Sequence, residues 1–369
     1  ARGMGGVGIG MSHGAESALA NPALITTVKG TEVSFGGTIF MPDVKNENTV
    51  MSGTTTATSA SDMNVIPAVS IASKITDNFY AGIGMWGTAG MGVDYRDAGN
   101  ASQFNMVTNL QLMQFGVPLA YKVDGLSLAV TPVLQYGALD INYNNPLTNS
   151  TVGAGVAQDL QFGFNLGAAY EVDGFTIGAT YKSQIDMEYK GQLTGAMGGF
   201  GLSYANDKLS TPEEYGVGVS YNTDGHTFAI DYKKVNWSKA KGYEDFLWED
   251  QDVYALGYEY ATADWAARLG YNYAQSPISN VPFMSMGVAG AYNLPYAGLV
   301  NAFNHLGFPA TVESHVTAGG TYFINEKTSV DLAVAYALQV EDTAQHFTGE
   351  DITTKHSQTS VSAQLNFAF

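Results

Sequence analysis

Three basic side chains stand where they could bind an anionic ligand. Lys182, Lys233 and Arg268 each fall in a run that alternates apolar and polar residues, and each is on the polar side of its run. Ammonium and guanidinium groups form strong charge-assisted hydrogen bonds with a carboxylate. We therefore predict these three residues as partners for a carboxylate-bearing ligand. Two alternatives stay open: the cations pair with acidic residues such as Asp231, or the ligand is a neutral alkane or aromatic molecule.

A second group of candidate binding residues is apolar and lies in one long segment, residues 276–312. Leu299, Val300, Phe303 and Leu306 recur at helical spacing, which predicts a short amphipathic helix. The segment either forms a groove for hydrophobic small molecules or packs against neighbouring parts of the chain. Methionine side chains in it would adapt to ligands of varied shape. The predicted substrate-binding residues of this segment are Phe283, Met284, Met286, Leu299, Val300, Phe303 and Leu306.

Other kinds of chemistry find little support in the sequence. The chain has no cysteine, which excludes thiolate metal sites and disulfides. Its six histidines are scattered and no G-x-S-x-G nucleophile motif occurs, so we predict no catalytic residue, no metal site and no cofactor. A formal charge of -18 provides no basic surface for a nucleic acid. A lipid hydrolase remains as an alternative that the sequence does not favour.

The elements that carry the candidate residues have the pattern of β-strands. In the closing stretch TSVSAQLNFAF, Val361, Leu365 and Phe369 fall on one face, and Ser362 and Gln364 fall on the other. Successive side chains of a strand point to opposite faces, so this segment has one apolar and one polar face. Antiparallel sheets of several kinds show this alternation, and the number of strands must distinguish between them.

Short turn signals divide the chain into hairpins. Strands expected near 31–42 and 357–369 complete a count of about fourteen, and bacterial membrane barrels have an even number of strands. Longer polar stretches alternate with the turns, as extracellular loops alternate with periplasmic turns in outer-membrane barrels. The six turn signals are Thr76-Asp77-Asn78, Asp124-Gly125, Asp173-Gly174, Asp224-Gly225, Thr262-Ala263-Asp264 and Asn325-Glu326-Lys327.

Composition favours a membrane barrel over a soluble β-sandwich. Only 14% of the residues are charged, whereas about a quarter is typical of a soluble domain. The polar faces consist mainly of small and uncharged residues, and tyrosines and tryptophans recur near the ends of the runs, as in an aromatic girdle. No stretch of about 18 apolar residues could form a spanning helix. We predict an all-β fold, a transmembrane antiparallel β-barrel of about 14 strands at residues 31–369, in the bacterial outer membrane.

The first thirty residues differ from the rest of the chain. Residues 1–30 lack the two-residue alternation and are rich in glycine and alanine. A barrel of about fourteen strands encloses a lumen that wall side chains alone do not fill. We therefore predict that residues 1–30 form a hatch, a plug inside the lumen, in which Asn21, Pro22 and Ala23 end a short Ala-rich turn. A general diffusion porin, the main alternative, would not need such a plug.

Several motifs in this order resemble the FadL/TodX family of outer-membrane transporters for long-chain fatty acids and aromatic hydrocarbons. The motifs are RGMGGVGIG followed by ANPALIT near the amino terminus, YKSQIDMEYKG (181–191), DYKKVNWS (231–238), LGYNYAQSPI (269–278) and HSQTSVSAQLNFAF (356–369). The resemblance implies a fourteen-stranded barrel with an amino-terminal hatch and passive uptake of hydrophobic molecules, which leave sideways through the wall. One stretch, YEDFLWEDQD before Val253, is acidic where a basic carboxylate-binding residue would be sought.

The predicted partners follow from the same interpretation. Hydrophobic small molecules are the expected cargo, and outer-membrane lipid and lipopolysaccharide are the expected surroundings. The terminal Phe369 resembles the carboxy-terminal aromatic residue that barrel assembly machinery recognises. We expect no nucleic acid partner, and we expect the barrel to be a monomer.

Glycines are concentrated in the third expected strand, which reads GIGMWGTAGMG. Glycine inside a strand weakens it and commonly marks a bulge or a kink. Two interpretations are open for Gly87, Gly90 and Gly92. The glycines make room for the hatch, or the strand bends inward there and opens a lateral port. A hydrophobic molecule that used such a port would reach the bilayer without entering periplasmic water.

Overall fold

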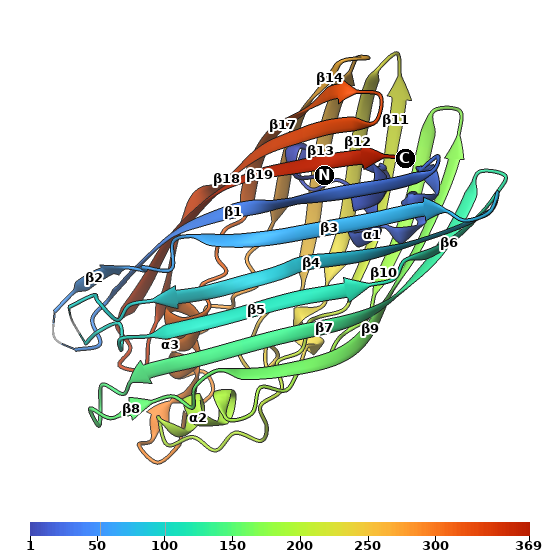
Figure 1. The fold of residues 1–369 in the computed structure, drawn as a ribbon. Helices are drawn as coiled ribbons and strands as arrows, with labels where there is room; N and C mark the ends of the chain where they lie inside the picture. Colours follow the sequence, from blue (N-terminus) through green and yellow to red (C-terminus); the bar gives the residue numbers. More distant parts are fainter. Residues whose placement is uncertain (52, 100) are drawn as a thin grey trace.

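The computed structural model describes residues 1–51, 53–99 and 101–369, and in this part of the chain fourteen antiparallel strands close into a barrel (Figure 1). The first and last strands pair along their length and close the wall. The predicted fold class and strand number are confirmed. The wall strands are β1 (Thr31–Asn48), β3 (Asn64–Lys74), β4 (Phe79–Asp94), β5 (Val107–Gly116) continued by β6 (Leu119–Val123), β7 (Leu126–Asn144), β9 (Ala157–Val172), β10 (Phe175–Lys182), β11 (Glu214–Thr223), β12 (His226–Val235), β13 (Gln251–Ala261), β14 (Trp265–Ala274), β17 (Ser314–Asn325), β18 (Thr328–Gln345) and β19 (Asp351–Ala368).

Tight turns join the strands at one end of the barrel, and longer loops join them at the other (Figure 1). Each predicted turn signal lies between two paired strands. At Asp124-Gly125, Asp173-Gly174 and Asp224-Gly225 both residues have positive φ. Two consecutive positive φ values define a type I′ hairpin turn, whose twist matches that of the strands, and the sequence Asp-Gly suits it. The Asp-Gly pairs therefore mark the positions of three of the tight turns.

The wall has an apolar outer face because side chains alternate along every strand. In β11, Tyr215, Val217 and Val219 are exposed, whereas the intervening Gly216, Gly218 and Ser220 are buried. A face of exposed Val, Leu, Ile and Phe side chains suits a bilayer rather than water. Many exposed aromatic residues lie towards the strand ends and include Tyr121, Tyr170, Tyr260, Trp265, Tyr322, Tyr254 and Tyr271.

The loop end carries the remaining elements of secondary structure. The predicted amphipathic helix is α3 (Tyr296–Gly307), which lies between β14 and β17. A second, unpredicted helix is α2 (Gln192–Gly198). The other elements are β2 (Thr55–Thr58), β8 (Thr151–Val152), β15 (Val288–Ala289), β16 (Leu294–Pro295) and the 3-10 turn η4 (Trp237–Lys239). Among the described residues, no helix is long and apolar enough to cross a bilayer.

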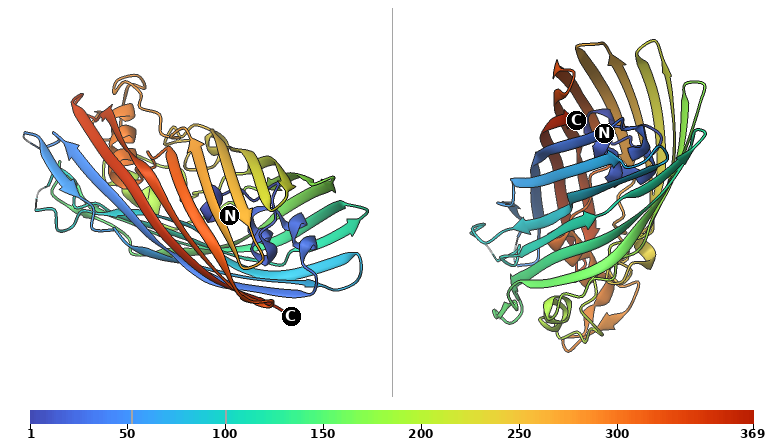
Figure 2. Two further views of the ribbon diagram at one scale, coloured as in Figure 1. Left: turned by 90° about the horizontal axis from the view of Figure 1, so that it is seen from above. Right: turned by 45° about the vertical axis from the view of Figure 1, so that its right-hand side comes forward.

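Residues 1–30 lie inside the barrel, near the end with the short turns (Figure 2). They form η1 (Arg2–Met4), η2 (Gly14–Glu16), α1 (Ser17–Ala20) and η3 (Pro22–Thr27). Hydrogen bonds attach this segment to opposite parts of the wall: Gly5 N–H donates to Thr317 Oγ1 on β17, and Asn21 Nδ2 donates to Ala168 O on β9. Small apolar clusters also join the segment to the strands.

Candidate functional site

An enclosed apolar pocket lies between the helices at the loop end. It encloses about 30 Å³, and α2, α3 and the residues just before β5 surround it. Leu299, Val300 and Phe303 line it, so three of the predicted apolar binding residues are brought together. No charged side chain lines it in the part of the chain that the structure describes. The lining residues are Phe104, Met106, Tyr143, Ala196, Met197, Phe200, Leu202, Tyr296, Leu299, Val300, Ala302 and Phe303.

Polar side chains on the other face of α3 hold the helix in place. Asn304 Oδ1 accepts a hydrogen bond from Trp248 Nε1 at 3.0 Å, and its Nδ2 donates to Phe246 O at 2.9 Å. His305 is fully buried, with Nδ1 2.7 Å from Thr354 Oγ1 and Nε2 3.0 Å from Asn280 Oδ1. Burial lowers the pKa of His305 to about 4, against the opposing effect of the Asp342 carboxylate. The imidazole is therefore neutral at neutral pH.

The other predicted residues of segment 276–312 lie outside the pocket. Leu306 is fully buried, in the apolar cluster beneath α3. Phe283 lies with its ring close to Gly349 in a neighbouring loop. Met284 and Met286 are about half exposed at the molecular surface, with exposed fractions of 50% and 48%. The helical part of the segment thus faces inward, and its methionines do not share a surface with it.

Sequence reasoning missed the residues that complete the pocket from other loops. Phe104, Met106 and Tyr143 belong to the loops and strand ends around β5 and β7, and Met197 and Phe200 belong to α2 and the residues after it. The ring centroids of Tyr143 and Phe200 lie 5.5 Å apart in a stacked arrangement. These residues are far apart in the chain and follow no common period. Only the closure of the barrel brings them together.

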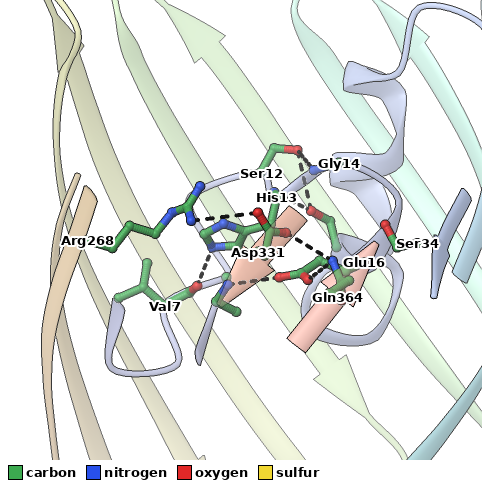
Figure 3. Close-up of polar contacts among 12 residues, drawn as sticks. Val7, Ser12, His13, Gly14, Glu16, Ser34, Arg268, Asp331 and Gln364 are labelled. Atoms are coloured by element: carbon green, nitrogen blue, oxygen red, sulfur yellow. Dashed lines mark hydrogen bonds and ion pairs between the residues drawn. The ribbon is translucent and has the colours of Figure 1, made fainter. Parts of the chain in front are cut away.

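Unlike the apolar pocket at α3, the lumen around residues 1–30 is lined by charged and polar groups. A cavity of about 750 Å³ lies there, lined by many charged groups of both signs. The ammonium of Ala1 lies 2.8 Å from Glu16 Oε1. Figure 3 shows that Glu16 also meets Gln364, while the His13 ring lies against Val7 O. The cavity is therefore a polar compartment, in contrast to the pocket at α3.

Burial and nearby charges fix the protonation states of two side chains in residues 1–30, His13 and Glu16. Burial and the nearby ammonium of Ala1 lower the pKa of His13 to about 3. Burial opposes ionisation of Glu16, but the ammonium and His13 outweigh it and lower the pKa of Glu16 to about 2. At neutral pH, a neutral imidazole therefore lies beside an ionised carboxylate that is paired with the chain terminus.

The three predicted cations all line this polar cavity, and two of them form ion pairs. Arg268 Nε lies 2.6 Å from Glu259 Oε2, and its Nη1 lies 4.0 Å from Asp331 Oδ1. Lys233 Nζ lies 3.6 Å from Glu214 Oε2. Lys182, at the end of β10, lines the same cavity. The arrangement matches the alternative of pairing between lumen charges more closely than a free carboxylate receptor.

Asp231 has the most specific contact with residues 1–30. Its carboxylate accepts hydrogen bonds from the backbone N–H groups of Gly8 and Ile9, both at 2.8 Å, and of Gly10 at 3.3 Å. An ionised acceptor makes such bonds stronger than neutral ones. Gly10 also approaches the backbone of β11 so closely that a Cβ there would lie 2.5 Å from Val219 N. Glycine is thus required at position 10.

The predicted Asn-Pro-Ala element joins two parts of residues 1–30 to each other and to the barrel wall. Asn21 is fully buried, and its Oδ1 accepts from Ala23 N–H, which caps η3. Its Nδ2 donates to Ile9 O and to Ala168 O on β9. Pro22 occupies the first position of η3, where a missing N–H is tolerated. One side chain therefore joins two parts of the segment and one wall strand.

The hydrogen-bonded wall is interrupted between β3 and β4. These strands pair from Lys74↔Tyr80 to Ala68↔Trp86, and within the described residues the ladder ends there. Residues 64–67 still pair with β1, and residues 87–94 still pair with β5. Pro67, next to the last pair, lacks an N–H and cannot extend the ladder. We call the unpaired edges of residues 64–67 and 87–93 the β3–β4 gap.

Each predicted port glycine borders this gap. The β4–β5 register shifts between Gly87 and Ala89, which places a bulge at the predicted kink. A Cβ on Gly87 would meet the side chain of Ile66, and a Cβ on Gly92 would meet the backbone of Thr108. A Cβ on Gly90 would meet nothing within 4 Å. Gly90, midway along residues 87–93, therefore has open space where a side chain would extend.

One apolar cluster extends from the pocket to the gap. Met91 of β4 and Phe303 of α3 both pack against it, and Val93 and Leu299 belong to it. At the end of α3, Gly307 O accepts a hydrogen bond from Thr108 Oγ1 on β5. The pocket, α3 and β4 are therefore parts of one packed unit.

The sequence matches the model of a known protein family. Residues 1–282 match the model of the family described as outer membrane protein transport protein (OMPP1/FadL/TodX). The chain belongs to this family. FadL/TodX members carry the description of transport proteins rather than of enzymes, and the family assignment places the barrel in the outer membrane.

Two relatives align with nearly the whole chain. A long-chain fatty acid transport protein of Escherichia coli O6:H1 is 25% identical over 92% of this chain and 90% of its own length. A 47 kDa outer membrane protein of Pasteurella multocida is 24% identical over 98% of this chain and 92% of its own.

Solved structures of FadL/TodX members share the fold. The Pseudomonas putida toluene transporter TodX superposes with a TM-score of 0.72 at 17% identity, covering 100% of this chain and 97% of its own. A Pseudomonas aeruginosa FadL homologue gives a TM-score of 0.73 at 16% identity, covering 99% and 96%. At such identities the superposition establishes the architecture alone.

Proposed function

We propose that this FadL/TodX-type transporter takes up hydrophobic molecules through the outer membrane and releases them sideways into the bilayer. The observation that carries the proposal is the single apolar cluster that joins the pocket at α3 to the β3–β4 gap. Relatives named as a long-chain fatty acid transport protein and a toluene transporter support hydrophobic cargo.

The first step is capture at the loop end. Burial of an apolar ligand in the pocket removes its surface from water, which stabilises the complex by about 25 cal/mol per Å² of apolar area. The enclosed 30 Å³ is smaller than such a ligand, so side chains must move to admit it. Met106 and Met197 are suited to this movement because their side chains are unbranched and adopt many conformations.

The second step is exit through the wall. From the pocket, a ligand that passes Phe303 and Met91 stays in apolar surroundings up to the gap. A ligand that moved down the lumen would enter the charged cavity around residues 1–30, where apolar surface is unfavourable. Gly87, Gly90 and Gly92 lack side chains that would obstruct the gap. The sideways route thus avoids the transfer of the ligand into water.

Residues 1–30 act in this proposal as a hatch that closes the lumen. The segment is attached to β9 by Asn21, to β12 by Asp231 and to β17 by Gly5. Such distributed attachment suits a plug that stays in place during transport. Water and small solutes are then kept out while cargo leaves through the wall.

Substitution of a pocket residue tests the proposed uptake. Leu299→Asp places a carboxylate among the apolar lining and should lower uptake of a hydrophobic tracer by cells about tenfold or more, because an unpaired buried charge opposes ligand entry. The matched control is Val288→Asp, on an exposed residue of the same loop. Heat-modifiable migration in gels verifies that both barrels assemble. Equal uptake by assembled Leu299→Asp and wild-type protein would refute the proposal.

A further inference from the structure

The lining of the pocket at α3 bears on whether the cargo is charged. We propose that its ligand is an uncharged hydrophobic molecule, and that it excludes ionised carboxylates. This inference rests on the proposed uptake of hydrophobic molecules and specifies the chemical class that the same pocket accepts.

The first argument is the composition of the pocket wall. Its twelve lining residues are aromatic or aliphatic, apart from the thioethers of Met106 and Met197 and the phenol groups of Tyr143 and Tyr296. The Tyr143 hydroxyl already donates to the backbone oxygen of Ala196. A carboxylate in this pocket would lose its hydration without gaining a cationic partner, and the loss is large for an ionised group.

The second argument is the position of the basic side chains. Arg268, Lys233 and Lys182 line the charged lumen cavity, and none of them lines the pocket. Arg268 and Lys233 are paired with Glu259 and Glu214. A carboxylate that reached them would compete with acidic residues already in place.

The third argument is the charge of the surrounding loops. The loop after η4 carries Glu244, Asp245, Glu249 and Asp250. Asp245 Oδ2 accepts a hydrogen bond at 2.6 Å from Tyr204, which lies two residues after the lining residue Leu202. Negative charge on this loop repels an anion and has no effect on a neutral hydrocarbon. The barrier to an ionised carboxylate therefore begins outside the pocket.

The five rings of the lining favour aromatic ligands among the uncharged ones. Phe104, Tyr143, Phe200, Tyr296 and Phe303 surround the cavity. Ring edges and faces at such sites form offset or edge-to-face contacts with another ring. A small neutral aromatic molecule is the ligand that this lining fits best.

Binding of a matched ligand pair tests the inference. Radiolabelled methyl decanoate and decanoate have the same chain and differ in charge, and their binding to the purified barrel in nanodiscs is measured at pH 8. We expect the ester to bind about 100-fold or more tightly than the carboxylate, because the pocket offers the anion no partner. Toluene should displace the ester. Counts bound to empty nanodiscs are subtracted.

A variant that should gain decanoate binding serves as the positive control, because it shows that the assay can detect the bound anion. Leu299→Lys introduces a cation into the lining and should raise decanoate binding at least about tenfold while it weakens binding of the ester. Val288→Lys places the same charge at an exposed position of the same loop outside the pocket and should leave the selectivity of the wild type.

The outcomes separate the inference from the proposed uptake. Ester binding without decanoate binding, with the reversal in Leu299→Lys, supports both. Equal affinity of wild-type protein for ester and decanoate overturns the selectivity and leaves the uptake of hydrophobic molecules standing. Binding of neither ligand by wild-type protein, with tracer uptake absent as well, overturns both.

Discussion

At the scale of single residues, the place of a charged residue in its strand did not determine which group it binds. Strand parity correctly predicted that Lys182, Lys233, Arg268 and Asp231 point into the lumen. Their partners come from strands and loops that are distant in the sequence, such as the backbone N–H groups of residues 8–10 for Asp231. Periodicity carries no information about such partners, so a carboxylate receptor and a set of internal ion pairs look the same in the sequence.

Asp231 gives a prediction about the hatch at this scale. Asp231→Asn keeps the shape of the side chain but removes its charge, and hydrogen bonds to a charged group contribute about 1.5–3 kcal/mol each. The attachment of residues 8–10 should weaken, and proteoliposomes should become permeable to small sugars in a swelling assay. Asp264→Asn, at an exposed turn, makes the same change in net charge and should stay impermeable. Identical swelling rates of the two variants would show that Asp231 does not hold the hatch.

At the scale of elements, regular patterns were predictable and irregular ones were not. Helical spacing of Leu299, Val300, Phe303 and Leu306 predicted α3 correctly. The seven-residue α2 contains two glycines within its bounds and begins after Gly191 in a left-handed conformation, so no helical period marks it in the sequence. A bend in β4 was one of two interpretations of its glycines, and a bulge lies between Gly87 and Ala89. The sequence analysis missed that Pro67 of β3 helps to end the β3–β4 ladder, because a proline does not show which neighbouring strand loses the hydrogen bond.

His305 gives a prediction about how firmly α3 is held. Its pKa is lowered from 6.5 to about 4 in the folded protein, so the unfolded loop binds a proton more readily than the folded one. The stability that neutral His305 gives to the docked helix is present above pH 6.5 and is lost as the pH falls towards 4. Hydrogen exchange of the α3 amides, corrected for intrinsic rates, should therefore quicken between pH 7 and pH 5.

The control for this prediction removes the titrating group. His305→Gln can still form hydrogen bonds to Thr354 and Asn280 but does not ionise, so its corrected exchange rates should depend less on pH than those of the wild type. The same pH dependence in both proteins would assign the effect to another group, such as His346, whose pKa burial also lowers.

At the scale of the whole molecule, the sequence determines the wall more completely than the interior. The wall was readable because alternation is local and recurs in each of the fourteen strands, and because six local turn signals separate the hairpins. The pocket lining, the polar lumen cavity and the position of residues 1–30 depend on contacts between distant segments. Recognition of Phe369 by assembly machinery, contact with lipopolysaccharide and a monomeric state stay predictions.

The central claim is that cargo leaves through the β3–β4 gap, and blocking the gap tests it most directly. Gly90 pairs with Gln111 on the exposed face of β5, and a side chain there meets no neighbouring atom within 4 Å, so Gly90→Trp should assemble normally and cover the gap. Ala267→Trp adds the same bulk to an exposed position of β14.

The measurement is the initial rate at which cells expressing each variant take up a neutral hydrophobic tracer. We predict that Gly90→Trp lowers this rate about tenfold or more, equivalent to about 1.4 kcal/mol of added barrier, while Ala267→Trp retains the wild-type rate. A Gly90→Trp barrel that is fully assembled and still transports at the rate of Ala267→Trp would contradict lateral exit.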